Sequence, residues 1–130
     1  MNMTLVEMDR YVNLLTDFMD VQSRRAEIVA TNIANADTPG FKAMELDFRE
    51  YLRTAAESAF DPQENSQAAM METLPQLVER EGNAVSIDGN SVDAGQEMAT
   101  LANAGGQFMF GAQMLQSRFR AIRAAIREGR

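Results

Sequence analysis

The 130-residue sequence contains no cysteine, no histidine and no tryptophan. Without cysteine and histidine it has no thiolate nucleophile, no imidazole base, no disulfide and no zinc site of the usual kind. These absences exclude most catalytic constellations. We therefore expect a protein that is not an enzyme and that needs no metal or other cofactor.

Long hydrophobic runs are also missing. No stretch approaches the 18 apolar residues of a membrane-spanning helix, so no direct membrane insertion is expected. Residues 1–9 have no basic leader and meet an acid at Glu7. This start does not resemble a cleavable secretory signal, and any route out of the cytoplasm would have to work without one.

Charge is unevenly distributed along the chain, whose net charge is −7. Residues 54–97 carry nine acids and one base, Arg80, whereas residues 98–130 carry five arginines and one acid. This asymmetry favours attraction between the two regions, within one molecule or between neighbours. Because the basic tail is short and holds a single aromatic residue, we expect no nucleic-acid partner.

The N-terminal region has a heptad pattern. Positions spaced alternately three and four residues apart, from residue 5 to residue 33, are all apolar except Gln22. A second apolar stripe, which includes Phe18 and Ile28, runs beside it. The pattern predicts an N-terminal assembly helix within residues 1–36, with a candidate interface made of Leu5, Met8, Val12, Leu15, Phe18, Met19, Ile28, Val29 and Ile33.

The C-terminal region repeats this pattern. Asp93 followed by Gln96 is typical of a helix N-cap, so a second assembly helix is expected over residues 93–130. Gly105 and Gly106 weaken the intrinsic stability of this helix. Its candidate interface consists of Met98, Leu101, Phe108, Leu115, Phe119, Ile122 and Ile126.

Together these patterns predict a mainly α fold in one domain, in which the long terminal helices pair as a coiled-coil-like bundle. The apolar face at each end is wider than one antiparallel partner would cover, and a two-helix hairpin alone buries too little area to be stable. We therefore expect both helices to be completed by packing against other subunits.

The segment between the helices is predicted in two parts. Residues 37–53 would form a turn and an extended or short helical segment, with Pro39-Gly40 in a type II turn. Residues 54–92 would form a flexible acidic linker, with helical turns near 63–72. Within the linker, residues 77–80 and 84–87 are compatible either with a β-hairpin over 77–87 or with irregular coil.

The junction from Ala30 to Lys42 resembles the N-terminal signature of the bacterial flagellar rod and hook proteins. Phe41 replaces the usual tyrosine of that signature. A second block, over residues 88–93 and 97–99, is similar to the C-terminal signature of one member, a protein of the proximal rod. The positions that match the turn of the signature are Asn32, Asn35, Asp37, Thr38, Pro39, Gly40 and Phe41.

This resemblance implies a structural subunit of the flagellar basal-body rod in the periplasm, needed for motility and assembling helically through its terminal helices. It also implies export, unfolded, through the flagellar type III apparatus. The implied partners are the chain itself, other rod proteins, the ring-to-rod adaptor, the membrane-ring protein and the type III export gate.

Two alternatives remain open on the sequence. Phe48 and Leu52 are similar to the short motif by which rod proteins are taken to engage the export gate, but their four-residue spacing also suits ordinary packing of one helical face. The heptad seams would equally suit a cytoplasmic coiled-coil adaptor or secretion chaperone. Self-association separates these functions, because a rod subunit should polymerise whereas an adaptor should form a discrete complex.

Overall fold

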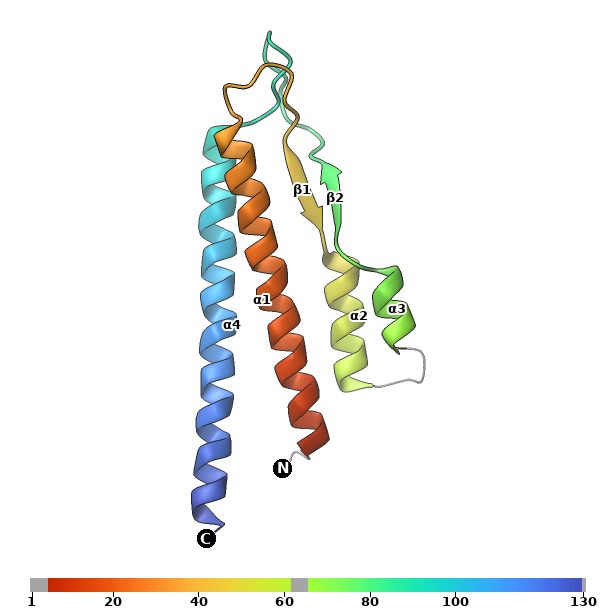
Figure 1. Ribbon diagram of the computed structural model, residues 1–130, viewed down its shortest axis with the longest axis vertical. Helices are drawn as coiled ribbons and strands as arrows, with labels where there is room; N and C mark the ends of the chain where they lie inside the picture. Colours follow the sequence, from red (N-terminus) through yellow and green to blue (C-terminus); the bar gives the residue numbers. More distant parts are fainter. Residues whose placement is uncertain (1–4, 62–65, 130) are drawn as a thin grey trace.

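The computed structural model describes residues 5–61 and 66–129. Its elements are α1 (Leu5–Ala34), β1 (Met44–Asp47), α2 (Arg49–Phe60), α3 (Ser66–Glu72), β2 (Gln76–Glu79) and α4 (Ala94–Glu128). The two long helices lie side by side and antiparallel (Figure 1). α1 lies between α4 and an arm built from the other four elements (Figure 1). The expected mainly α fold with paired terminal helices is confirmed.

The ends of the long helices follow their local sequence. Asp93 is the N-cap of α4, and its Oδ1 accepts a hydrogen bond of 3.0 Å from the backbone N–H of Gln96, as expected. α1 ends at Ala34, just before the turn. There the N–H of Phe41 donates to the carbonyl of Thr38 at 3.2 Å, and Gly40 has a φ of 74°. These features are those of the expected type II turn, whose third position needs a positive φ.

Of the two alternatives for residues 77–87, the hairpin within this segment is wrong and irregular coil is found at 84–87, while the short antiparallel pair forms with another partner. β2 pairs in antiparallel register with β1, so that Leu46 lies opposite Leu77, and residues 84–87 form no strand. The pairing with β1 accompanies burial of Leu46, whereas all four residues from 84 to 87 are exposed, including the apolar Val85 and Ile87. Their segment instead folds back through a turn in which Gly89 donates to the carbonyl of Ser86 at 2.9 Å.

The flexible linker that was expected to begin at residue 54 is partly wrong, because α2 continues through that boundary to Phe60. Thr54 and Ala55 are buried, which anchors the middle of α2. Arg53 contacts Glu50 and lies 2.6 Å from Glu57, and these pairs along the helix add modest support. The expected helical turns near 63–72 are found at α3, Ser66–Glu72, while residues 62–65 lie outside the described residues.

α4 is continuous through Gly105, Gly106 and Gly111, and Gly111 packs directly against α1. A Cβ atom placed on Gly111 would lie 2.7 Å from Cγ of Met19 and 3.3 Å from Cδ1 of Phe18. No atom lies within 4 Å of the corresponding position at Gly106. The glycine at 111 therefore sets the distance between the two long helices.

Gly111→Val should lower the free energy of unfolding by about 1–3 kcal/mol, because the added atoms overpack the contact with α1. Gly106→Val is the matched control, and its effect should be slightly favourable because valine is the better helix former. Urea denaturation of both variants measures the difference. Equal stabilities for the two variants would show that the interhelical distance is not fixed at Gly111.

Candidate functional site

The fully buried residues of α4 are small or polar. Glu97, Ala104 and Gly111, spaced by seven, are buried. The positions predicted as the C-terminal interface sit beside this row: Leu101, Leu115 and Ile122 are half-buried, while Met98, Phe108, Phe119 and Ile126 are exposed. Met98, Phe119 and Ile126 lie on a row offset by one residue, about 100° around the helix, whereas Leu101, Leu115 and Ile122 lie closer to the buried row. The first three side chains are therefore left largely outside the contact between the two helices.

The predicted interface of α1 is divided in the same way. Leu15 and Val29 are buried, and the half-buried members are Met8, Val12, Phe18, Met19, Ile28 and Ile33. The side chain of Leu5 lies outside the described part of the chain. α1 is thus only partly enclosed by α4 and the arm, and the two long helices together retain apolar surface for a further contact.

Asn32 of the signature joins three elements at the closed end of the helix pair. Its Nδ2 donates to the carbonyl of Met44 at 2.7 Å and to Oε2 of Glu97 at 3.0 Å. Its Oδ1 accepts from the N–H of Met44 at 3.0 Å. The residue is fully buried, so each polar atom of its side chain is paired where water is excluded.

Arg80 extends this network to the end of β2. Its guanidinium forms a buried ion pair with Glu97 and lies 3.3 Å from Oε2 of the half-exposed Glu45. The side chain of Glu97 is 0% exposed, so this pair and Asn32 are its only compensation for lost solvation among the described residues. Glu97 belongs to the block that is similar to the C-terminal family signature, but neither it nor Arg80 was predicted to form a site. Two features of the sequence could have indicated the pair: Arg80 is the one base within residues 54–97, and Glu97 is next to the apolar row of the C-terminal helix.

The remaining signature residues build the tip of the molecule. Buried Asn90 donates from Nδ2 to the carbonyls of Asn35 and Thr38, at 2.9 and 2.8 Å. The N–H of Gly40 donates to the carbonyl of Asp88 at 2.8 Å. Asp37, Thr38, Pro39 and Gly40 are exposed, and Asn35 and Phe41 are half-buried. The turn is therefore held against the loop before α4 by hydrogen bonds within one molecule.

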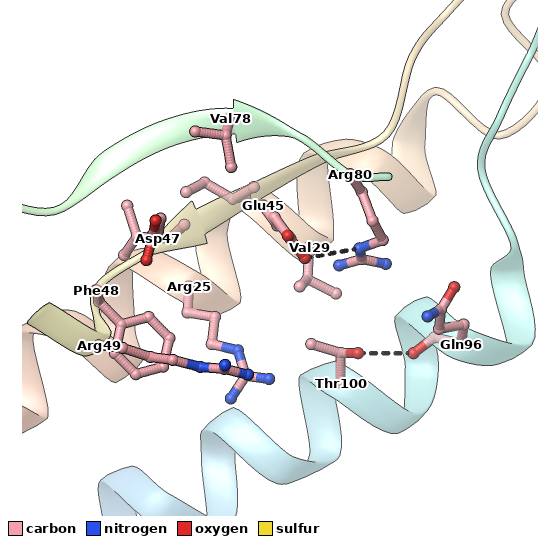
Figure 2. A pocket seen from close by; sticks show the side chains of 12 residues that line it. Arg25, Val29, Glu45, Asp47, Phe48, Arg49, Val78, Arg80, Gln96 and Thr100 are labelled. Carbon is pink, nitrogen blue, oxygen red and sulfur yellow. Dashed lines mark hydrogen bonds and ion pairs between the residues drawn. The ribbon is translucent and has the colours of Figure 1, made fainter. Parts of the chain in front are cut away.

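A cavity of about 530 Å³ lies between α1, β1 and α4 (Figure 2). Arg25 lines it, donates to Oδ1 of Asn103 at 2.9 Å and stands 5.7 Å from the ring centre of Phe48. Burial lowers the pKa of Arg25, and the nearby positive charge of Arg80 lowers it further. These side chains interact with one another, an arrangement that suits structural support rather than bond-making chemistry.

A smaller acidic cavity lies beside α1, near the start of α2. Asp17 and Asp20 line it together with Tyr51. Burial raises the pKa of Asp17, its hydrogen bond with Tyr51 opposes that rise, and the charge of Asp20 adds to it. Burial, followed by the charge of Asp17, raises the pKa of Tyr51. The two cavities thus carry unlike charge on the arm side of α1.

The two residues of the export-type motif lie in the folded arm. Phe48 precedes α2 as its N-cap residue and packs under Arg25, and Leu52 lies one turn into the helix. Both are half-buried. In the folded chain they contribute to packing, and their role in export stays a prediction.

Two further findings concern residues 5–61 and 66–129. No helix there is both long and apolar enough to cross a membrane. The same residues contain no group of three or more acidic side chains arranged to hold a metal ion.

Comparison with known proteins links this architecture to one family. A family model described as "Flagella basal body rod protein" matches residues 19–42. The flagellar basal body rod protein FlgB of Aeromonas hydrophila is 30% identical over 114 residues, which cover 84% of this chain and 86% of that protein. FlgB of Proteus mirabilis (strain HI4320) is 29% identical over 85% of this chain and 89% of that protein. FlgB of Escherichia coli (strain K12) is 25% identical over 96% and 99% respectively.

Proposed function

The chain belongs to the FlgB family of flagellar basal body rod proteins, and from this membership and its surfaces we propose how it enters the rod. It is a structural subunit of the bacterial flagellar basal body. The proposed mechanism is that the exposed apolar residues of α4, with the half-buried rows of α1, pack against neighbouring rod subunits. These contacts build the helical wall of the proximal rod.

One observation carries the proposed mechanism. The contact between α1 and α4 uses the small and polar row through Glu97, Ala104 and Gly111, and leaves Met98 and Ile126 each 60% exposed. Burying large apolar side chains is the dominant favourable term in association. A helix that turns these side chains away from its own partner is suited to a second contact.

The finer partners follow from family membership and belong to the same proposal. They are sister rod proteins on the lateral faces, and the ring-to-rod adaptor and membrane-ring protein at the base. The chain would reach this place in the periplasm after export, unfolded, through the type III gate. Phe48 and Leu52, which pack inside the arm once folding is complete, would be available to the gate only in the unfolded chain.

Complementation of a deletion strain tests the mechanism. Loss of the gene should abolish swimming and stall assembly at the ring stage, and the wild-type copy should restore both. Met98→Asp/Phe119→Asp should fail to restore swimming, although its isolated chain keeps the helix content of the wild type, because carboxylates replace apolar groups that a neighbour must bury.

Gln113→Asp/Ser117→Asp is the control, with the same two acids at exposed polar positions of α4. It should swim normally. Normal swimming of the Met98→Asp/Phe119→Asp strain would exclude the apolar face of α4 as an assembly surface. Normal swimming of the deletion strain itself, with no second gene copy, would refute the role in the rod.

A further inference from the structure

The molecule has two unlike long sides. The arm meets α4 near the first turns of that helix, where Arg80 pairs with Glu97, but along the rest of α4 the helix α1 lies between the two (Figure 1). The arm of one molecule therefore cannot cover the outward face of its own α4. Any contact between these two surfaces has to join different molecules.

The outward face of α4 combines apolar and basic groups. Met98 and Met109 are exposed on the same side of the helix as the arginines described next, and the exposed Phe108, Phe110, Phe119 and Ile126 lie toward the two edges of that side. Three exposed arginines, Arg120, Arg123 and Arg127, lie in its last third. None of the three takes part in an ion pair among the described residues. The arginines are spaced by three and four residues, which places them on one side of the helix.

The arm combines apolar and acidic groups. Phe60, Met71, Leu74 and Leu77 are exposed on or beside its helices and second strand. Asp61, Glu72 and Glu79 are exposed carboxylates that have no ion-pair partner among the described residues. Glu72 lies in the last turn of α3, where a carboxylate opposes the helix dipole and adds nothing to the stability of the helix.

Charge decides which pairs of these surfaces are compatible. Two α4 faces that meet in parallel would bring arginines together, and two arms would bring carboxylates together. An arm against an α4 face instead pairs opposite charges and covers apolar groups on both sides. Like charges brought together at an interface cost free energy, whereas complementary ones select the partner and its register.

We propose that the acidic, apolar arm of one copy docks on the basic, apolar outward face of α4 in a second copy of this chain. The proposal rests on the proposed rod function and names the surface that meets α4. Because donor and acceptor surfaces lie on different sides of one molecule, the contact is heterologous, and each added copy leaves one arm and one α4 face free. Such contacts propagate into a ring or an open helical wall.

A charge swap on the full-length chain tests this pairing by sedimentation velocity over a range of concentrations. Arg120→Glu/Arg123→Glu makes the α4 face acidic, and Asp61→Lys/Glu72→Lys makes the arm basic. Each variant alone should associate about tenfold more weakly than the wild type, because arm and α4 face then carry like charges. An equimolar mixture should restore association, because both cross-contacts are complementary again. Wild-type association should also weaken in high salt.

Asp37→Lys/Glu81→Lys is the matched control, since it changes the net charge as much as the arm variant does but at exposed positions near the tip. Its association should equal that of the wild type. Circular dichroism of every variant should show unchanged helix content. If a double variant misfolds, the single variants Arg123→Glu and Glu72→Lys take its place. Mixing these two should restore association to a proportionally smaller extent.

The outcomes separate this proposal from the rod function. If the wild type associates and the folded mixture does not, the arm is not the partner of α4, and the complementation result still decides the rod function. If the wild type stays monomeric at every concentration reached, a second copy is not the occupant and the proposal is overturned. Restoration in the mixture, with an unaffected control, supports it.

Discussion

Replacing Glu97 by alanine should lower the free energy of unfolding by about 3 kcal/mol. The change removes the buried partner of Arg80 and one acceptor of the Asn32 amide, and leaves a guanidinium in the interior. Breaking one side of a buried ion pair costs about 3–5 kcal/mol. The lower end applies because Arg80 keeps its contact with Glu45.

Urea denaturation of the wild type, Glu97→Ala, Arg80→Ala, their double variant and one control measures this effect. Glu128→Ala, at an exposed position of the same helix, should change stability by less than about 0.5 kcal/mol. The double variant Arg80→Ala/Glu97→Ala should lose less than the two single variants combined, because no charge is then left unpaired. Additive losses, or a Glu97→Ala chain as stable as the wild type, would mean that the network does not hold the four elements together.

Replacing Asn90 by aspartate should cost about 2–4 kcal/mol, although the two side chains have nearly the same shape. The amide Nδ2 of Asn90 donates to two backbone carbonyls, and its Oδ1 accepts from the N–H of Val92 at 2.7 Å. Aspartate keeps the acceptor but loses both donors, and it places a charge against the carbonyls of Asn35 and Thr38. An unpaired buried group costs about 1–3 kcal/mol, and more when it is charged.

Hydrogen exchange at the amide of Gly40 gives a local measurement, because that N–H donates to the loop that Asn90 holds. It should exchange faster in Asn90→Asp, in parallel with the loss of thermal stability. Asn13→Asp, at an exposed position of α1, is the control and should change neither quantity. Unchanged protection of Gly40 in Asn90→Asp would show that the tip is held by its backbone contacts alone.

The helices and the turn were predictable because their signals are local. A seam at steps of three and four, an Asp93 cap and a Pro39-Gly40 pair act within a few residues, so no knowledge of the rest of the fold is needed. The partner of residues 76–79 is set instead by Leu46, some thirty residues earlier, which is buried in the assembled fold. The sequence pattern within one strand therefore does not predict which strand it pairs with.

The inner face of α4 escaped prediction for a different reason. Apolar periodicity favours the row that contains Met98 and Phe119 as the contact with α1, but the fully buried row there runs through Ala104 and Gly111. Small residues let two backbones come close and fill the contact without large side chains. In a subunit that also has neighbours, the strongest apolar signal need not point to the partner within the same chain.

The signature residues carry a consequence for the specificity of assembly. Asn32, Asn35 and Gly40 form hydrogen bonds within the molecule that join helix, strand and loop. These residues stabilise the fold of the single molecule, so their presence in a sequence indicates this architecture but does not identify the neighbouring subunits. Selection among neighbouring subunits would then depend on the outer side chains, which can be changed without breaking these internal hydrogen bonds.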